Sequence, residues 1–120
     1  MKIASGYNRV VLLIGRLAIK FPNPASQRQF ICGMRCNLKE FDLYCESNND
    51  ARLMRVYSLG FLGLWLVCKR YEVINRSLTN EELAEIPLSE IDPKIGNFGY
   101  NDEGGIVVLD YGYSDSWYIG

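Results

Sequence analysis

Residues 27–46 are the segment that most constrains the fold, because their pattern is typical of one long α-helix. Ser26 to Gln29 has the S-x-x-Q form of a capping box, which marks a helix start. Apolar residues then recur at helical spacing, at Phe30, Met34, Leu38, Phe41 and Cys45. The polar run 47–50 ends the pattern. We therefore predict a helix from about Gln27 to Glu46.

The segment before this helix has the pattern of a β-hairpin. Two apolar runs, Arg9–Ile14 and Leu17–Phe21, flank Gly15 and Arg16, and a Gly-X pair between strands favours a type II′ turn. Lys2–Ala4 is expected to add a short strand in front of the hairpin.

The segment after the helix predicts more strands and one short helix. Leu53–Leu59 and Leu64–Lys69 read as strands, with Phe61 and Trp65 in the core. Thr79-Asn80-Glu81-Glu82 is a second capping box, opening a helix that Pro87 ends. The final hairpin is expected from Phe98–Tyr100 and Ile106–Leu109 around a five-residue turn.

This order of elements predicts an α+β fold, with a mainly antiparallel sheet, one long helix, a short helix and a C-terminal hairpin. The 120 residues are the length of one domain, residues 1–120. A hydrophobic fraction of 48% and a charged fraction of 22% are ordinary for a globular chain and exclude global disorder.

Several function classes are excluded by composition. The sequence contains no His, which removes Ser-His-Asp and Cys-His hydrolases and most zinc enzymes. A net charge of −1 argues against a nucleic-acid partner. The longest apolar runs fall far short of the roughly 20 residues that cross a membrane. Met1–Ala4 lacks the apolar region of a signal peptide, so a cytoplasmic location is expected.

The four cysteines give little functional signal. They are Cys32, Cys36, Cys45 and Cys68, with no C-x-x-C pair among them. Cys32 and Cys36 would share a helix face and could in principle hold a soft metal. The favoured interpretation is that all four are reduced thiols packed as small hydrophobic groups.

A lysine and a glutamate stand in positions where they would form an ion pair. Lys20 lies in an otherwise apolar strand, on the same face as Ala18. Glu40 lies in the middle of the long helix, between Leu38 and Phe41. A strand lysine paired with a helix glutamate would have its ammonium group held where it can bind a phosphate.

Three further polar residues complete a recognisable pattern. Asp92 and Asn97 form a D-x-x-x-x-N motif, and Asp110-Tyr111-Gly112 follows a strand. With Ala18-Ile19-Lys20 and Glu40 in front, the order and spacing resemble a protein-kinase-like core. Residues 97–112 particularly resemble the catalytic-loop hairpin of aminoglycoside-kinase and atypical-kinase relatives. The chain is also similar to short uncharacterised phage and prophage proteins that carry an A-I-K-F-P stretch and a terminal D-Y-G.

The resemblance implies a role for each of these residues, with ATP and Mg²⁺ as cofactors. Lys20 would contact the nucleotide phosphates, and Glu40 would orient it. Asp92 would accept the substrate hydroxyl proton. Asn97 and Asp110 would hold Mg²⁺. Ala18 would cover the face of the adenine, and the backbone of the linker strand Leu66–Tyr71 would meet the adenine edge. Residues 1–71 would correspond to a kinase small lobe, and residues 72–120 to a reduced catalytic-loop hairpin with an aromatic tail.

Departures from the family pattern leave enzymatic activity open. Only Gly6 falls where a kinase has its glycine-rich loop, Glu90-Ile91 replaces the usual His-Arg before Asp92, and a substrate lobe is missing. One hypothesis is therefore a small phage-type protein that binds Mg-nucleotide with at most reduced phosphotransferase activity. The alternative is an inactive phage accessory or anti-defence factor, for example an anti-CRISPR, that binds a host protein. Either could complete its site as a homodimer. A third possibility is an unrelated fold in which the five polar residues never converge.

Overall fold

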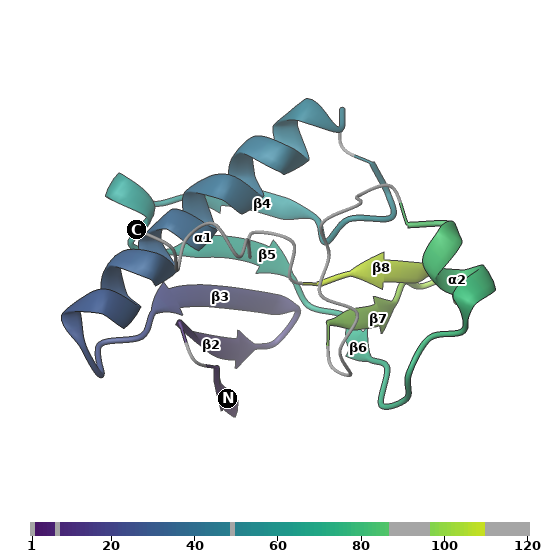
Figure 1. The fold of residues 1–120 in the computed structure, drawn as a ribbon, viewed down its shortest axis with the longest axis horizontal. Helices are drawn as coiled ribbons and strands as arrows, with labels where there is room; N and C mark the ends of the chain where they lie inside the picture. The colour runs from purple at the N-terminus through teal and green to yellow at the C-terminus, as the bar shows by residue number, and fades with distance from the viewer. Residues whose placement is uncertain (1, 7, 49, 87–96, 110–120) are drawn as a thin grey trace.

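The computed structural model describes residues 2–6, 8–48, 50–86 and 97–109, and its fold is α+β, as the sequence predicts. Figure 1 shows a long helix lying across one sheet, with a smaller sheet and a short helix at one end. The elements in chain order are β1 (Lys2–Ser5), β2 (Arg9–Ile14), β3 (Leu17–Pro22), α1 (Gln27–Glu46), β4 (Val56–Leu59), η1 (Phe61–Gly63, a 3₁₀ turn), β5 (Leu66–Lys69), β6 (Glu72–Val73), α2 (Asn80–Ala84), β7 (Phe98–Tyr100) and β8 (Ile106–Val108).

The larger sheet is antiparallel, with its five strands in the order β1-β2-β3-β5-β4. The predicted β2–β3 hairpin is confirmed, with Ile14 opposite Leu17 across a two-residue turn. Gly15 has a φ of +54°, and Arg16 does not share the positive φ. This combination fits the type II′ turn, which needs the left-handed region at its first residue only.

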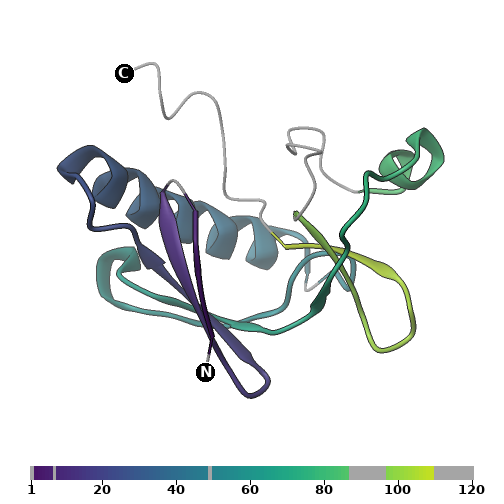
Figure 2. The ribbon, with the colours of Figure 1, turned by 90° about the horizontal axis from the view of Figure 1, so that it is seen from below.

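Helix α1 has the bounds that the sequence predicts, and it covers one face of the larger sheet (Figure 2). Ser26 caps it by accepting a hydrogen bond from the Gln29 backbone N–H at 3.1 Å. The apolar spacing that identifies the helix does not mark its most buried side, because Leu38 is 40% exposed and Cys45 is also exposed. The buried side carries Cys32, Gly33, Cys36, Asn37, Glu40 and Tyr44.

The smaller sheet has the order β6-β7-β8, and the chain enters it directly after β5. The sequence predicts the β7–β8 hairpin but not β6, whose two residues pair with β7. Leu53 forms an isolated parallel bridge with Val108, and the Met54 N–H donates to the Val108 carbonyl at 2.8 Å. Residues from both sheets, among them Leu66 and Phe98, share one hydrophobic cluster.

The short helix α2 starts with both halves of the predicted capping box. Thr79 accepts from the Glu82 backbone N–H, and the Glu82 carboxylate accepts from the Thr79 backbone N–H. Arg76 adds two parallel hydrogen bonds to the same carboxylate, each 2.9 Å long. Pro87 and the last ten residues lie outside the described residues.

Two core assignments and two strand starts made from the sequence are wrong. Phe61 is 71% exposed and Trp65 is 41% exposed, because they flank a tight turn beside the edge strand β4, beyond which the described residues add no further strand to this sheet. Leu62 and Gly63 turn the chain there with φ values of +55° and +82°. The same turn and the irregular segment before β4 shorten the two strands, which begin at Val56 and Leu66.

Among the described residues, neither helix combines the length and hydrophobicity needed to span a membrane. Cys32, Cys36 and Cys68 are buried as expected, and none of the four cysteines forms a disulfide. Cys45 departs from that expectation, because the end of α1 turns its side chain outward.

We expect Gly33→Ala to destabilise the protein, although alanine is the better helix former. A Cβ at Gly33 would lie 2.3 Å from the Asn8 carbonyl oxygen and 2.7 Å from the Pro22 Cα, so α1 could not approach the sheet as closely. Overpacking of this kind costs about 1–3 kcal/mol. Chemical denaturation measures the loss in the free energy of unfolding. Gly6→Ala is the matched control, because its Cβ would meet no described neighbour closer than 3.4 Å.

Candidate functional site

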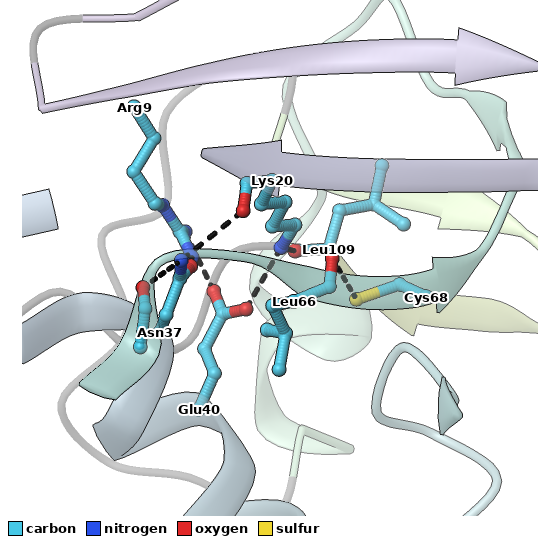
Figure 3. A network of polar contacts seen from close by, with 8 residues as sticks. Arg9, Lys20, Asn37, Glu40, Leu66, Cys68 and Leu109 are labelled. Carbon is cyan, nitrogen blue, oxygen red and sulfur yellow. Dashed lines mark hydrogen bonds and ion pairs between the residues drawn. The ribbon is translucent and has the colours of Figure 1, made fainter. Parts of the chain in front are cut away.

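The Glu40 carboxylate is the centre of a buried ionic network (Figure 3). Lys20 on β3 donates to its Oε2 at 2.9 Å, and Arg9 on β2 donates to its Oε1 at 2.7 Å. Glu40 is completely buried, and Lys20 and Arg9 are 4% and 7% exposed. The ion pair expected between Lys20 and Glu40 is therefore present, and a second cation shares the same carboxylate.

Asn37 connects this network to the backbone around it. Its side-chain oxygen accepts from Arg9 Nη1 at 3.1 Å. Its amide nitrogen donates to the Lys20 carbonyl at 3.1 Å and to the Gly63 carbonyl at 2.8 Å. One fully buried side chain thus holds α1 against β3 and the η1 turn, while all of these polar groups find partners.

Burial and neighbouring charges shift the pKa of the carboxylate in the network in opposite directions. Burial alone would raise the pKa of Glu40, but the Arg9 and Lys20 cations and their hydrogen bonds hold that pKa well below its usual range. The carboxylate is therefore ionised at neutral pH. Burial raises the pKa of the neighbouring Cys68 thiol to about 11, so this thiol is neutral and poorly nucleophilic.

Leu109 links the ionic network to the C-terminal hairpin. The Lys20 ammonium donates to the Leu109 carbonyl at 2.5 Å, across 89 positions of sequence. The Leu109 N–H donates to the Asn97 carbonyl at 2.7 Å. One series of hydrogen bonds therefore links Lys20, Glu40 and Asn97, three predicted site residues that lie far apart in the sequence.

The remaining site predictions have different outcomes. Asp92 and Asp110 lie outside the described residues, although Asp110 directly follows Leu109 in the sequence. Ala18 is 2% exposed and packs in the core, so it offers no open face to an adenine ring in this conformation. Lys20, Glu40 and Asn97 are all buried, so none of the three is a solvated surface group.

Sequence reasoning missed Arg9 and Asn37. A signal for Asn37 existed, because it lies three residues before Glu40 and the two must share one face of a helix. Arg9 opens a strand, where a charged residue is most often solvated, and only the β2–β3 pairing places it beside the helix. Arg9 therefore carried no local signal of its role.

Lys20 has one ammonium donor that none of the described residues uses. An ammonium group has three donors, and two of those on Lys20 are directed at Glu40 and Leu109, which leaves one for a phosphate oxygen. No group of three or more acidic or Cys side chains that could hold a metal occurs within the described ranges. Asn97, which the sequence predicts to be a Mg²⁺ ligand, is 7% exposed, and a side-chain amide oxygen is a type of ligand that Mg²⁺ accepts.

The loop between β1 and β2 fits a glycine-rich phosphate cradle poorly. The Gly6 N–H donates to the Arg9 carbonyl at 2.8 Å, and the Asn23 side chain donates to the Gly6 carbonyl at 2.9 Å. The backbone donor that a phosphate would need at Gly6 is therefore already used within the loop.

Comparison of the chain with protein-family models, curated proteins and solved structures gives no match. The kinase resemblance therefore rests on the residues and geometry of this chain alone.

We expect the free energy of unfolding to fall as the pH drops below about 4.5, and Glu40→Gln to reduce that dependence. A carboxylate whose pKa is lower in the folded state than in the unfolded state stabilises the protein at pH values above the unfolded-state pKa. This stabilisation is lost as the pH falls towards the folded-state pKa. At pH 7 the variant should lose about 3–5 kcal/mol, since two buried cations lose their counterion.

Urea denaturation between pH 7 and pH 2 measures both effects. Glu46→Gln makes the same charge change at an exposed site at the end of α1 and should leave the pH profile nearly unchanged. A Glu40→Gln profile parallel to that of the original protein would contradict an ionised Glu40.

Proposed function

We propose that the chain binds a Mg-nucleotide through a reduced kinase-like site, with Lys20 as the residue that contacts phosphate. One observation carries the proposal: the Lys20 ammonium lies between the Glu40 carboxylate and the Leu109 carbonyl. This arrangement joins a strand, a helix and the end of a β-hairpin at one cation. An ammonium group held by two hydrogen bonds has little conformational freedom, so binding an anion would cost little additional side-chain entropy.

The order of the elements supports the same proposal. Lys20 on β3 and Glu40 on α1 are twenty residues apart, and the β7–β8 hairpin separates Asn97 from Leu109. The kinase pattern also has a lysine strand, a glutamate helix, a D-x-x-x-x-N loop and a hairpin before an Asp-aromatic-Gly triplet. Asp110 and Asn97 would then hold Mg²⁺ near the Lys20 ammonium.

The chemistry proposed for these residues is phosphate binding, with at most slow phosphoryl transfer. Mg²⁺, when bound, would neutralise phosphate charge. Lys20 would donate its third N–H to a phosphate oxygen, Glu40 would fix the ammonium position, and Asp92 would accept a hydroxyl proton. The internal hydrogen bonds of the β1–β2 loop remove one expected source of transition-state stabilisation.

Isothermal titration with ATP, with and without Mg²⁺, tests this proposal. We expect saturable binding that requires Mg²⁺ and weakens by about tenfold to a hundredfold in Lys20→Met, the loss expected for one charge-assisted hydrogen bond. Asp110→Asn should abolish the Mg²⁺ dependence. Lys2→Met is the matched control, because it removes an exposed strand lysine and should not change affinity.

Lys20→Met also removes a cation from buried Glu40, so a second variant separates binding from folding. Lys20→Arg keeps the charge beside Glu40 but replaces a compact ammonium by a planar group with a different reach. A folded Lys20→Arg protein that binds ATP as tightly as the original would contradict the proposal, as would a lack of binding to the original protein at millimolar ATP.

A second candidate function, binding of another protein, is favoured by the exposed turn between β4 and β5. Phe61 and Leu62 are 71% and 59% exposed there. Leu62 also has a φ of +55°, a conformation that costs a leucine about 1 kcal/mol and a glycine almost nothing. An apolar side chain that is both strained and exposed favours contact with a partner protein.

This second function predicts that Leu62→Gly raises the free energy of unfolding by about 1 kcal/mol while weakening a protein contact. Capture experiments with the original protein, Lys20→Met and Leu62→Gly measure the contact. A partner retained by Lys20→Met and lost by Leu62→Gly supports a protein-binding role. A partner that Leu62→Gly retains contradicts a role for this turn.

A further inference from the structure

A cavity of about 500 Å³ lies apart from the ionic network, where the larger sheet meets the β7–β8 turn. None of Arg9, Lys20, Asn37 or Glu40 lines it. Its walls come from the end of α1, the segment before β4, β4 itself, the end of β5 and the β7–β8 turn. The side chains that give it chemical character are Tyr44, Arg55, Tyr57, Lys69 and Tyr71.

Two cations and two aromatic rings line this cavity as neighbouring pairs. The Arg55 guanidinium carbon lies 5.6 Å from the centre of the Tyr57 ring, and Lys69 Nζ lies 5.4 Å from that of Tyr71. The Lys69 N–H donates to the Arg55 carbonyl at 2.9 Å, so the backbones of the two cationic residues are adjacent. The cavity therefore has positive charge beside flat apolar surfaces.

A β-bulge contributes to this arrangement. Val56 pairs with Cys68 and Ser58 pairs with Val67, so Tyr57 is the extra residue between them. A bulge leaves its extra residue unpaired and redirects side chains, and bulges are frequent next to binding sites. Tyr57 is 50% exposed, which leaves its ring available to a ligand.

The Arg55 guanidinium differs from its charged neighbours because none of the described residues accepts a hydrogen bond from it. Among the described residues no hydrogen bond or ion pair to this group occurs, and its recorded contact is with the Tyr57 ring. By contrast, Arg52 donates to both oxygens of Asp50, which also neutralises the acidic group in the cavity wall. Lys69 pairs with Asp102 at 3.2 Å, but Asp102 is 91% exposed, so solvent weakens that pair.

The tyrosine hydroxyls add further donors. The Arg55 backbone N–H donates to the Tyr71 hydroxyl at 3.2 Å, so the hydroxyl proton of Tyr71 remains available to another acceptor. Burial raises the pKa of Tyr44, and the nearby Arg55 charge opposes that rise. Tyr44 is therefore neutral at pH 7 and keeps its own proton to donate.

We propose that this cavity binds a phosphate monoester carried on an aromatic or other planar group. The Arg55 guanidinium, the Lys69 ammonium and the Tyr71 hydroxyl supply donors from different sides, which suits the several oxygens of a phosphate. Two cations match its charge, which is close to −2 at neutral pH. The Tyr57 and Tyr71 rings supply flat surfaces for the planar group. This second site is independent of the nucleotide site proposed above.

Titration of the ¹⁵N-labelled protein with phenyl phosphate at constant ionic strength tests the proposal by NMR. We expect saturable shifts of the backbone amides of Arg55, Tyr57, Lys69 and Tyr71. Inorganic phosphate should shift the same amides but bind more weakly, because it lacks the ring. Phenol, which lacks the phosphate, should not saturate them.

Three variants distinguish a specific binding site from general electrostatic attraction of the ligand to a basic surface. Arg55→Gln should weaken the binding of phenyl phosphate by about tenfold or more, because one charge-assisted contact is lost. Tyr71→Phe, which removes only a hydroxyl, should also weaken it. Arg70→Gln, an equal charge change at an exposed neighbouring residue that does not line the cavity, should leave affinity unchanged.

Two results would overturn the proposal. One is equal weakening by Arg70→Gln and Arg55→Gln, which would indicate nonspecific attraction to a basic surface. The other is the absence of saturable shifts at these amides with tens of millimolar phenyl phosphate. Retention of the shifts in Lys20→Arg, even where that variant has lost ATP binding, would show that the two sites are distinct.

Discussion

The desolvation of one carboxylate is the constraint on which the rest of this structure depends. Glu40 is completely buried, and an ionised group without water must find its full set of partners inside the protein. Arg9 and Lys20 supply them, and each comes from a different strand of the larger sheet. The register of β2 against β3 and the rotation of α1 about its axis are therefore fixed together, because a shift in either would leave a buried charge unpaired.

The same constraint extends to segments that the carboxylate does not touch. Asn37 satisfies Arg9 and two backbone carbonyls, which ties the helix to β3 and to the η1 turn. Lys20 reaches the Leu109 carbonyl, which ties the larger sheet to the C-terminal hairpin. Hydrophobic packing alone would tolerate small displacements of these elements, whereas hydrogen bonds to charged groups weaken steeply with distance and angle. The polar network thus specifies positions within a core whose stability comes mainly from apolar burial.

Local sequence patterns were sufficient for most of the elements, but not for β6, for the starts of β4 and β5, or for what surrounds each element. The bounds of α1, the Gly15 turn and the β7–β8 hairpin follow from capping, periodicity and turn chemistry, all of which act over a few residues. The Lys20–Glu40 pair could also be expected, from a lysine in an apolar strand and a glutamate in the middle of the helix. Arg9 could not be predicted, because its role depends on strand pairing, and neither could the Tyr57 bulge. Phe61 and Trp65 were misassigned because hydrophobicity indicates what a side chain favours, not whether another layer is there to cover it.

The two candidate sites use cations in opposite ways, and the difference follows from burial. In the ionic network the cations are nearly inaccessible, so most of their hydrogen-bonding capacity stabilises the fold and a ligand can use only what remains on Lys20. At the Tyr57 bulge Arg55 is exposed and its guanidinium contacts a ring, and since no carboxylate of the described residues pairs with it, its donors would serve an incoming anion in the proposed site. Removing Lys20 must therefore disturb folding and binding together, whereas removing the Arg55 charge should disturb binding alone. The two proposed tasks are carried by different residues, because none of the side chains of the ionic network lines the cavity beside Arg55 and Lys69.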